Sequence, residues 1–377
     1  MLVTLLVYWP VLGFSFFHDD VYDLPRTEAV SYWELFRDPL PGNRYYRPVT
    51  YAVWKVVRDV AGTYPAPLLH SLPLLCHAVS GWLLYRLLAR ITGSPWAILA
   101  GLLFLLYPFS YQSLAILGAL FHPFVTMLLL AMLMCWLEGR RRESPWFMSA
   151  SLALAALALW SHEYGVAAFP MLLALDLLLW RRGQVRLLSW WLIGPASAEI
   201  VFLLLWLSFE RPEGDPVSRR DMLHNLAFWL QGMTYPASRQ AVWIANVFNV
   251  GAGWLATCLS LLALAITLLA YWLANRIWLG VTLLGISFIA FLPSTFTLTN
   301  EYVLSGPRLL YIVAPACAAF WGLLPGLKPE RFVALQRRAR IKTGWRVATL
   351  TLLCLTIVQS LLFIERRLEM FDYGSQA

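Results

Sequence analysis

Long uncharged apolar runs recur along the whole of this 377-residue chain, and they constrain its fold more than any other feature. Hydrophobic residues make up 60% of the sequence and charged residues only 13%, and the mean hydropathy is +0.63. About 20 consecutive apolar residues in a helix cross the ~30 Å hydrocarbon core of a bilayer. The sequence therefore predicts an all-α, polytopic membrane protein with a single membrane-embedded domain over residues 1–377.

Eleven runs are candidates for transmembrane helices. We expect the third to continue toward Tyr111, and the region 224–250 to hold a further interfacial or re-entrant piece. The first is expected to remain as a signal anchor, because it lacks a small-residue cleavage site. The predicted spans are Leu2–Phe17, Ala66–Tyr85, Trp96–Tyr107, Phe124–Leu137, Trp146–Trp160, Gly165–Trp180, Leu187–Phe209, Gly251–Ala274, Ile277–Leu292, Leu310–Leu324 and Val347–Ile364.

Basic residues are distributed unevenly between the predicted loops. With the N-terminus in the cytoplasm, the inner segments hold 16 of the 29 lysines and arginines but three acids, whereas the outer segments hold 13 with 16 acids. This asymmetry follows the positive-inside rule, and it explains the net charge of +8 without a nucleic-acid partner. It predicts a multi-pass membrane protein that carries Asp19 and Asp20 on its outer face. All five cysteines fall inside predicted spans, which argues against disulfides and thiolate metal sites.

The first outer loop, residues 18–65, is the longest stretch between predicted spans. Apolar residues recur in it at helical spacing on both sides of a turn rich in proline and glycine. The pattern predicts two short amphipathic helices on the membrane surface, one over 29–36 and one that begins at Pro48. A solvated loop without function is the plain alternative. The charged residues that we single out there are Asp19, Asp20, Arg44 and Arg47.

Most other ionisable residues of the spans gather at their predicted outer ends. A transporter would instead carry such groups near the midplane of the bilayer, along a pathway. Because these ionisable residues lie at the same predicted depth in the membrane, we expect them to line one outward-facing cavity at the level of the lipid headgroups. A second outer loop, residues 210–240, is either a solvated connection or a mobile lid over that cavity. The residues expected to meet there are Asp19, Asp20, His122, His162, Glu163 and Arg308.

These residue types suit the transfer of a sugar from a lipid phosphate. The acceptor hydroxyl must lose a proton as it attacks the anomeric carbon, and we expect Asp19 to be the base. Arginine matches the oxygens of the departing phosphate, so Arg47 or Arg308 would hold it. Asp20 either orients Asp19 or binds a divalent ion, and metal dependence stays open. Further candidate ligands for such an ion are His122, His162 and Glu163.

Several short motifs follow one another in a definite order. They are Asp19-Asp20, His70 and His77 with Leu83-Leu84-Tyr85-Arg86, Leu103-Phe104 with Pro108, Ser161-His162-Glu163-Tyr164-Gly165 with Pro170 and Asp176, and Arg308-Leu309-Leu310-Tyr311. In this order they resemble the GT-C glycosyltransferases, and most of all the bacterial relatives of the transmembrane O-mannosyltransferases. The resemblance implies a GT-C-like fold, a polyprenyl-phosphate sugar donor and an inverting transfer to an acceptor hydroxyl on the outer face. It implies these donor-phosphate ligands: Arg44, Arg47, Arg308 and Tyr311.

The chain also departs from that family's pattern. Pro73 replaces the asparagine usual between the two histidines, His162 replaces a lysine, and His122-Pro123 replaces a basic-acidic pair. Neither the sugar nor the acceptor is identified. Two other interpretations remain: a transporter or flippase of lipid-linked sugars, and a non-catalytic scaffold with the same fold.

Overall fold

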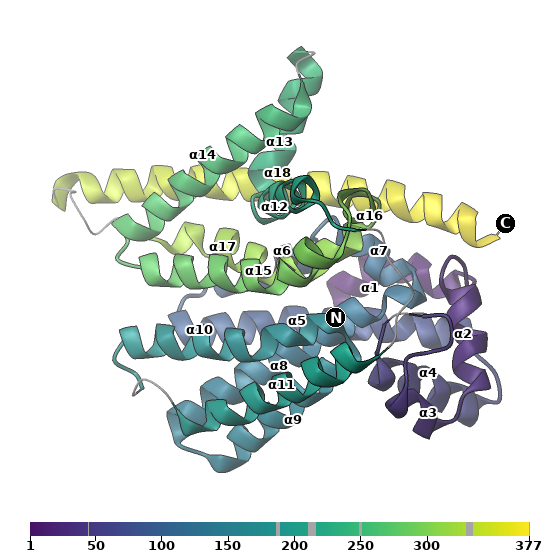
Figure 1. The fold of residues 1–377 in the computed structure, drawn as a ribbon. Coiled ribbons are helices and arrows are strands. Elements are labelled where there is room, and N and C mark those ends of the chain that lie inside the picture. Colours follow the sequence, from purple (N-terminus) through teal and green to yellow (C-terminus); the bar gives the residue numbers. More distant parts are fainter. Residues whose placement is uncertain (44, 186–188, 210–215, 249–250, 329–334, 377) are drawn as a thin grey trace.

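The computed structural model of the protein describes residues 1–43, 45–185, 189–209, 216–248, 251–328 and 335–376. Throughout these ranges every regular element is a helix, which confirms the all-α class (Figure 1). The elements up to residue 181 are α1 Leu2–Tyr8, η1 Trp9–Gly13, α2 Asp20–Ala29, α3 Tyr32–Arg37, α4 Pro48–Ala61, α5 Ala66–Thr92, α6 Ala97–Leu105, α7 Ser110–Ala115, η2 Leu117–Ala119, α8 Phe121–Arg142, α9 Pro145–Ser161, η3 Glu163–Ala167 and α10 Ala168–Arg181.

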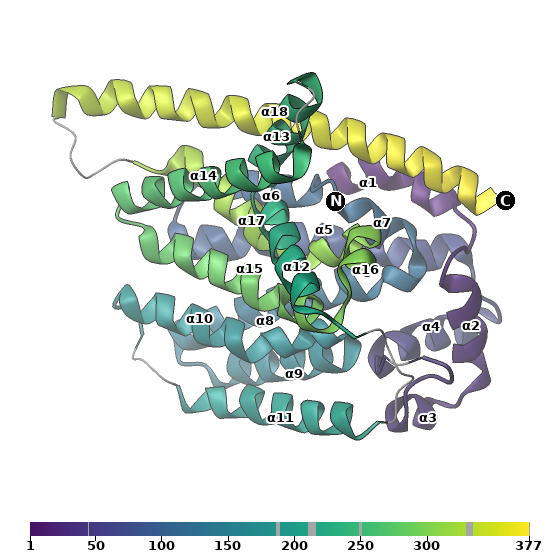
Figure 2. The same cartoon turned by 45° about the horizontal axis from the view of Figure 1, so that its top comes forward.

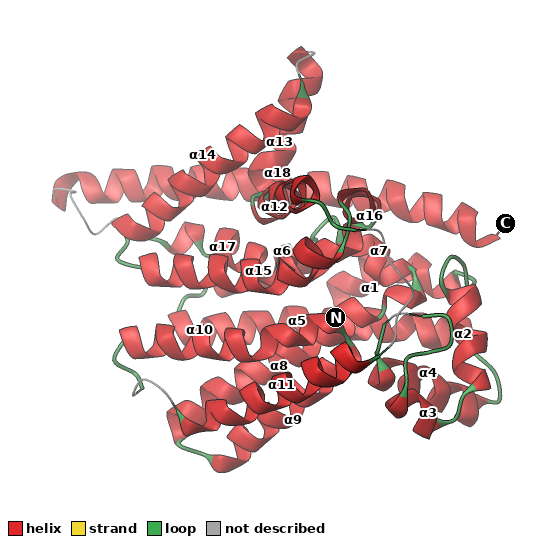
Figure 3. Cartoon of the chain, viewed as in Figure 1, coloured by secondary structure: helices red, strands yellow, loops and turns green. Residues whose placement is uncertain are grey.

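The second half of the chain is built in the same way. Figure 3 shows that the described residues of this half are mainly helical as well. The elements are η4 Trp190–Leu192, α11 Ile193–Ser208, α12 Arg219–Met233, α13 Tyr235–Phe248, α14 Ala252–Leu273, α15 Ile277–Thr297, α16 Asn300–Ser305, η5 Pro307–Val313, α17 Ala314–Gly322, η6 Leu324–Gly326 and α18 Leu335–Gln376.

In the described part of the chain, eight helical stretches are long and apolar enough to cross a membrane, and each coincides with a predicted span. They are Ala66–Thr92, Leu117–Arg142, Glu163–Arg181, Trp190–Ser208, Leu255–Leu273, Ile277–Thr297, Pro307–Gly326 and Lys342–Gln376. The other three predicted spans correspond to shorter helices. Leu2–Gly13 and Pro145–Ser161 are apolar but short, and α6 has nine residues. Eleven crossings therefore stay a prediction, whereas the multi-pass character is supported.

The two ends of the helical bundle are formed by different elements (Figure 1). Helices α2, α3 and α4 gather at one end, which we call the loop end. The end of α18 also reaches it, since the ring of Phe371 lies 5.5 Å from those of Phe17 and Tyr111. We call the opposite end the arginine end. There Arg141 donates to the carbonyl of Arg90, at a distance of 3.2 Å.

Three helices, rather than the two expected, form the first outer loop. The predicted helix over 29–36 is broken, because Val30 is extended and Ser31 caps a new helix, α3. Ser31 and Glu34 form a capping box, in which each side chain accepts from the other residue's backbone N–H. Helix α2 before this break was not expected. Helix α4 begins at Pro48, as predicted.

The loop helices pack against the bundle through a hydrophobic cluster of their own. Trp54 of α4 is completely buried, and its ring centroid lies 5.5 Å from that of Phe121 at the start of α8. This packing is not that of a solvated loop, and it fixes α2–α4 on the membrane helices. The buried members of the cluster are Leu24, Leu35, Leu40, Tyr51, Trp54, Leu69, Leu117, Leu120 and Phe121.

The third predicted span ends earlier than expected. Helix α6 stops at Leu105 instead of continuing toward Tyr111, and α7 begins separately at Ser110. Pro108 lies in the break, where its ring and its missing N–H prevent a continuous helix. The short elements α7 and η2 consequently cross the loop end before α8 begins.

The described part of the second outer loop is helical and partly buried, so it is not a solvated connection. Helix α12 runs across the bundle helices and turns into α13 (Figure 2). The indole of Trp321 donates to the carbonyl of Met233 at 2.9 Å, and the hydroxyl of Tyr107 donates to that of Gly232 at 3.1 Å. The expectation of an interfacial or re-entrant piece over 224–250 stays a prediction. Residues 210–215 lie outside the described residues.

Candidate functional site

Asp19 and Asp20, which we call the acidic pair, lie at the loop end. Their two carboxylates have opposite environments. His18 adopts a left-handed backbone with φ of +58°, and α2 begins immediately after Asp19. The side chain of Asp19 is 53% exposed, with an oxygen 3.0 Å from the Nδ1 of His18. Asp20 is completely buried. Asp19 is therefore open to a substrate, whereas Asp20 is part of the structure.

Asp20 ties α2 to the short element η2. Its Oδ2 accepts from the backbone N–H groups of Leu117 at 3.2 Å and Phe17 at 3.5 Å, and its Oδ1 accepts from that of Gly118. Burial raises the pKa of Asp20 from its usual 3.8 to about 7, although these three N–H groups act in the opposite direction. Because both oxygens are engaged, the structure favours the orienting role for Asp20 over metal binding.

Arg47 and Glu163 form a buried ion pair between residues 116 positions apart. The Nε and Nη2 atoms of Arg47 lie 2.9 and 2.8 Å from Oε2 of Glu163, and the two side chains are 12% and 16% exposed. The guanidinium also lies 4.2 Å from the ring of Tyr45 and 4.4 Å from that of Phe121. Arg47 is thus already neutralised, which makes it a poor primary ligand for a phosphate. Arg44 lies outside the described residues.

His162 and His122 lie beside this ion pair, with ring centroids 4.9 Å apart. The Nδ1 of His162 accepts from the backbone N–H of Tyr164 at 3.0 Å. Burial, followed by the charge of Arg47, lowers the pKa of His162 well below its usual value, so the ring is neutral. Its 3.5 Å approach to Glu163 is therefore a contact between a neutral ring and a carboxylate rather than an ion pair.

Two buried polar atoms of this group have no hydrogen-bond partner among the described residues. They are Oε1 of Glu163 and Nδ1 of His122. A buried polar atom left unpaired costs about 1–3 kcal/mol. Other buried atoms among the described residues also lack a partner, among them both ring nitrogens of His70. The atoms of Glu163 and His122 are available for hydrogen bonds to a polar ligand.

Arg308 is held by its backbone and leaves its guanidinium largely available. Its N–H donates to Oε1 of Gln112 at 3.0 Å, and its carbonyl accepts from the hydroxyl of Ser113 at 3.5 Å. The guanidinium donates to the hydroxyl of Tyr302 at 3.2 Å. In the described part of the chain it makes no ion pair with a carboxylate. This is the arrangement expected of a cation that receives an anionic ligand.

Tyr311 has its hydrogen-bond partner inside the bundle. It is completely buried, and its hydroxyl lies 2.6 Å from Nδ1 of His77, whose Nε2 lies 3.1 Å from the carbonyl of Leu105. Nε2 must donate to that carbonyl, so Nδ1 accepts from the tyrosine hydroxyl. The hydroxyl of Tyr311 is thus already engaged within the protein, and the expectation that Tyr311 binds the donor phosphate stays a prediction.

One short segment, residues 112–118, brings the two halves of the site together. Its first two residues hold the backbone of Arg308, and Leu117 and Gly118 hold Asp20. A Cβ at Gly118 would lie 3.1 Å from both Cβ of Asp19 and Oδ1 of Asp20. A Cβ there would be a tight contact, so the acidic pair would have to move by a few tenths of an ångström to admit it.

Asp23 is a buried acid near Asp19 that the sequence interpretation did not single out. It follows Asp19 by one turn of α2, and its N–H donates to the carbonyl of Asp19 at 3.0 Å. Burial and then the charge of Asp19 raise the pKa of Asp23, whereas Arg26 and Arg47 lower it. The spacing of four residues from Asp19 was the available signal, once α2 is recognised as a helix.

The candidate metal ligands do not form a metal centre in this structure. Among the described residues no three side chains of His, Cys, Asp or Glu are placed to hold an ion together.

Comparison with protein-family models finds no match, and a search of curated proteins finds no similar sequence. The function is therefore argued from the site alone.

Proposed function

We propose that the protein is an integral-membrane, inverting glycosyltransferase that takes a sugar from a polyprenyl phosphate and joins it to an acceptor hydroxyl. The observation that supports this most strongly is the 112–118 segment, which binds a buried aspartate next to an exposed one and also binds Arg308. It supplies a base and a cation from one rigid support. The arginine-rich loops at the opposite end favour an outward-facing site in a bacterial cytoplasmic membrane.

In the proposed reaction Asp19 acts on the acceptor. As the acceptor oxygen attacks the anomeric carbon, its proton passes to the exposed carboxylate of Asp19. The bond between the anomeric carbon and the phosphate oxygen breaks, and the phosphate leaves with the electron pair. A single displacement inverts the configuration at that carbon. The leaving group is already ionised, so no general acid is required, in contrast to glycoside hydrolysis.

Arg308 and Asp20 have supporting roles. Arg308 faces the charge that grows on the departing phosphate, because its guanidinium carries no carboxylate partner of its own among the described residues. Asp20 fixes the start of α2 and thereby the position of Asp19. The unpaired atoms of His122 and Glu163 offer hydrogen bonds to sugar hydroxyls.

The experiment is turnover of a panel of polyprenyl-phosphate sugars by the purified protein and by Asp19→Asn. We expect one donor class to be consumed, and the variant to lose at least about a hundredfold in rate while still folding. Asp38→Asn is the matched control, because Asp38 is an exposed acid of the same loop whose ion-pair partner among the described residues is its neighbour Arg37.

Two outcomes would count against the proposal. Full turnover by Asp19→Asn would show that Asp19 is not the base. Specific binding of lipid-linked sugars without any turnover would favour the transporter or the non-catalytic scaffold instead.

A further inference from the structure

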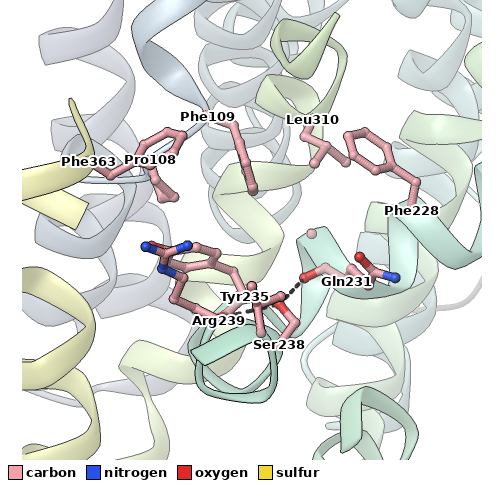
Figure 4. A pocket seen from close by; sticks show the side chains of 11 residues that line it. Pro108, Phe109, Phe228, Gln231, Tyr235, Ser238, Arg239, Leu310 and Phe363 are labelled. Carbon is pink, nitrogen blue, oxygen red and sulfur yellow. Dashed lines mark hydrogen bonds between the residues drawn. The ribbon is translucent and has the colours of Figure 1, made fainter. Parts of the chain in front are cut away.

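A cavity of about 110 Å³ lies where α12 turns into α13 (Figure 4). Figure 4 shows Phe109 and Leu310 on one side of it, and Tyr235 and Arg239 on the other. Phe363 of α18 lies beside them. The lining is mainly apolar, and it includes four aromatic side chains and one arginine.

Two guanidinium groups flank the same aromatic ring at this cavity. The Cζ of Arg239 lies 6.0 Å from the ring centroid of Phe363, and that of Arg367 lies 5.2 Å from it. Arg367 also lies 5.9 Å from the ring of Tyr111. In the part of the chain that the structure describes, neither arginine forms an ion pair.

Some arginines of the bundle are neutralised, since Arg47, Arg140 and Arg142 each pair with a carboxylate. Arg239 and Arg367 have no carboxylate partner among the described residues, and Arg367 donates only to the sulfur of Met370, at 3.7 Å. Two such guanidinium groups beside an apolar cavity favour a ligand that is anionic at one end and apolar at the other. Phosphate suits the anionic end, because its oxygens accept the parallel N–H groups of arginine.

The cavity adjoins the proposed reaction site. Leu310, which lines it, follows Arg308 by two residues in η5, and Phe109 immediately precedes α7, the helix whose Gln112 holds Arg308. On the other side Val242 lines the cavity, and the next residue, Trp243, is 59% exposed. An apolar chain that leaves the cavity therefore meets an apolar face of α13, which continues to Phe248 at 70% exposure.

We propose that Arg239 and Arg367 bind the phosphate of a polyprenyl phosphate, whose first isoprene units occupy this cavity. The inference rests on the proposed function, in which the lipid carrier of the sugar must dock next to Arg308. It identifies a carrier-binding surface formed by α12, α13 and α18, separate from the acidic pair. A cavity of this size holds one end of such a chain, and the rest lies along α13.

The test is direct binding of sugar-free undecaprenyl phosphate to the full-length protein in nanodiscs. Undecaprenol, which lacks the phosphate, tests whether the phosphate is required for binding. Dioleoyl phosphatidic acid, which carries a phosphate on acyl chains, tests whether the polyprenyl chain is required. Arg239→Gln and Arg367→Gln remove the proposed ligands, and Arg366→Gln is the matched control because Arg366 is exposed on the same helix. Val242→Trp fills the cavity. Thermal unfolding of each variant verifies its fold.

We expect undecaprenyl phosphate to bind tightest, with about a tenfold loss in Arg239→Gln and in Val242→Trp, a smaller loss in Arg367→Gln and none in Arg366→Gln. Equal binding of undecaprenol or of phosphatidic acid would overturn the proposal, as would equal affinities of Arg239→Gln and Arg366→Gln. Because the ligand carries no sugar, binding is independent of transfer. Arg239-dependent binding in a protein that transfers no sugar would sustain this site and end the proposed function.

Discussion

The two ends of the bundle treat their charged residues differently. At the arginine end, arginines are engaged by groups of the protein itself: Arg140 by Asp176 at 3.1 Å, Arg142 by Glu138 at 2.8 Å, and Arg182 by the carbonyl of Ile91 at 2.6 Å. At the loop end, charged side chains that have an oppositely charged partner lie beside others that have none among the described residues.

The proposed reaction uses groups at the loop end that have no partner of fixed opposite charge. Asp19 is exposed beside the imidazole of His18, and the guanidinium of Arg308 has a tyrosine hydroxyl as its hydrogen-bond partner among the described residues. Charges satisfied within the protein serve stability and topology, whereas charges left unsatisfied in a folded site are available to a ligand. The comparison teaches that residue type alone does not identify a candidate site residue. Whether its charged side chain already has a partner inside the protein is more informative.

The largest expected contrast between the ends is in stability. Arg47→Ala leaves Glu163 charged and buried, so we expect the free energy of unfolding to fall by about 3 kcal/mol. Arg142→Ala at the arginine end removes a pair whose arginine is 57% exposed, and should cost less than about 1 kcal/mol. Denaturant unfolding in detergent measures both. Equal losses would remove the distinction between the two ends.

Asp20 should make stability depend on pH. Its folded pKa of about 7 lies above the usual 3.8, so the folded state binds the proton more tightly than the unfolded state does. The free energy of unfolding is then highest below about pH 4 and falls as the pH rises toward 7, by up to a few kcal/mol. Asp20→Asn should remove this slope, and unfolding curves at a series of pH values measure it. Asp38→Asn should keep the slope, and a variant slope equal to the wild type would contradict the assignment.

Donor affinity should distinguish the arginines of the two ends. Arg308→Gln removes a guanidinium that has no carboxylate partner among the described residues, and we expect about a tenfold loss of donor affinity. Arg90→Gln at the arginine end, where Glu138 lies 3.5 Å away, should leave that affinity unchanged. Equilibrium binding of a polyprenyl-phosphate sugar gives both values. An unaltered affinity in Arg308→Gln would exclude Arg308 from the donor site.

Local signals in the sequence predicted local structure well. Helix α4 begins at Pro48 because the fixed φ of proline and its missing N–H suit a first helical position. The break between α2 and α3 also had a local signal, the capping pair Ser31 and Glu34, which the apolar spacing over 29–36 outweighed in the prediction. Long apolar runs likewise predicted the membrane helices.

Long-range pairing was beyond the sequence. Nothing near Arg47 indicates that its charge is neutralised by Glu163, more than a hundred residues away, and nothing near Tyr311 indicates that its hydroxyl binds His77. The pattern predicted residue types for a site but could not indicate which of them already have a partner inside the protein. That depends on tertiary contacts: η3 lies against the start of α4, and η5 lies against α5.

The smallest expected effect on activity is that of adding a methyl group at Gly118, next to the acidic pair. In Gly118→Ala the new Cβ would lie 3.1 Å from Cβ of Asp19 and Oδ1 of Asp20, so the acidic pair must move by a few tenths of an ångström. Asp20 keeps its hydrogen bonds with a small adjustment, and stability should change by less than about 1 kcal/mol. Asp19 should be displaced from the acceptor, and we expect about a fivefold loss of kcat with little change in KM. Gly285→Ala in α15, where no atom lies within 4 Å of the new Cβ, is the matched control and should leave kcat unchanged. Equal kcat values in the two variants would show that the exposed aspartate does not depend on the segment that supports it.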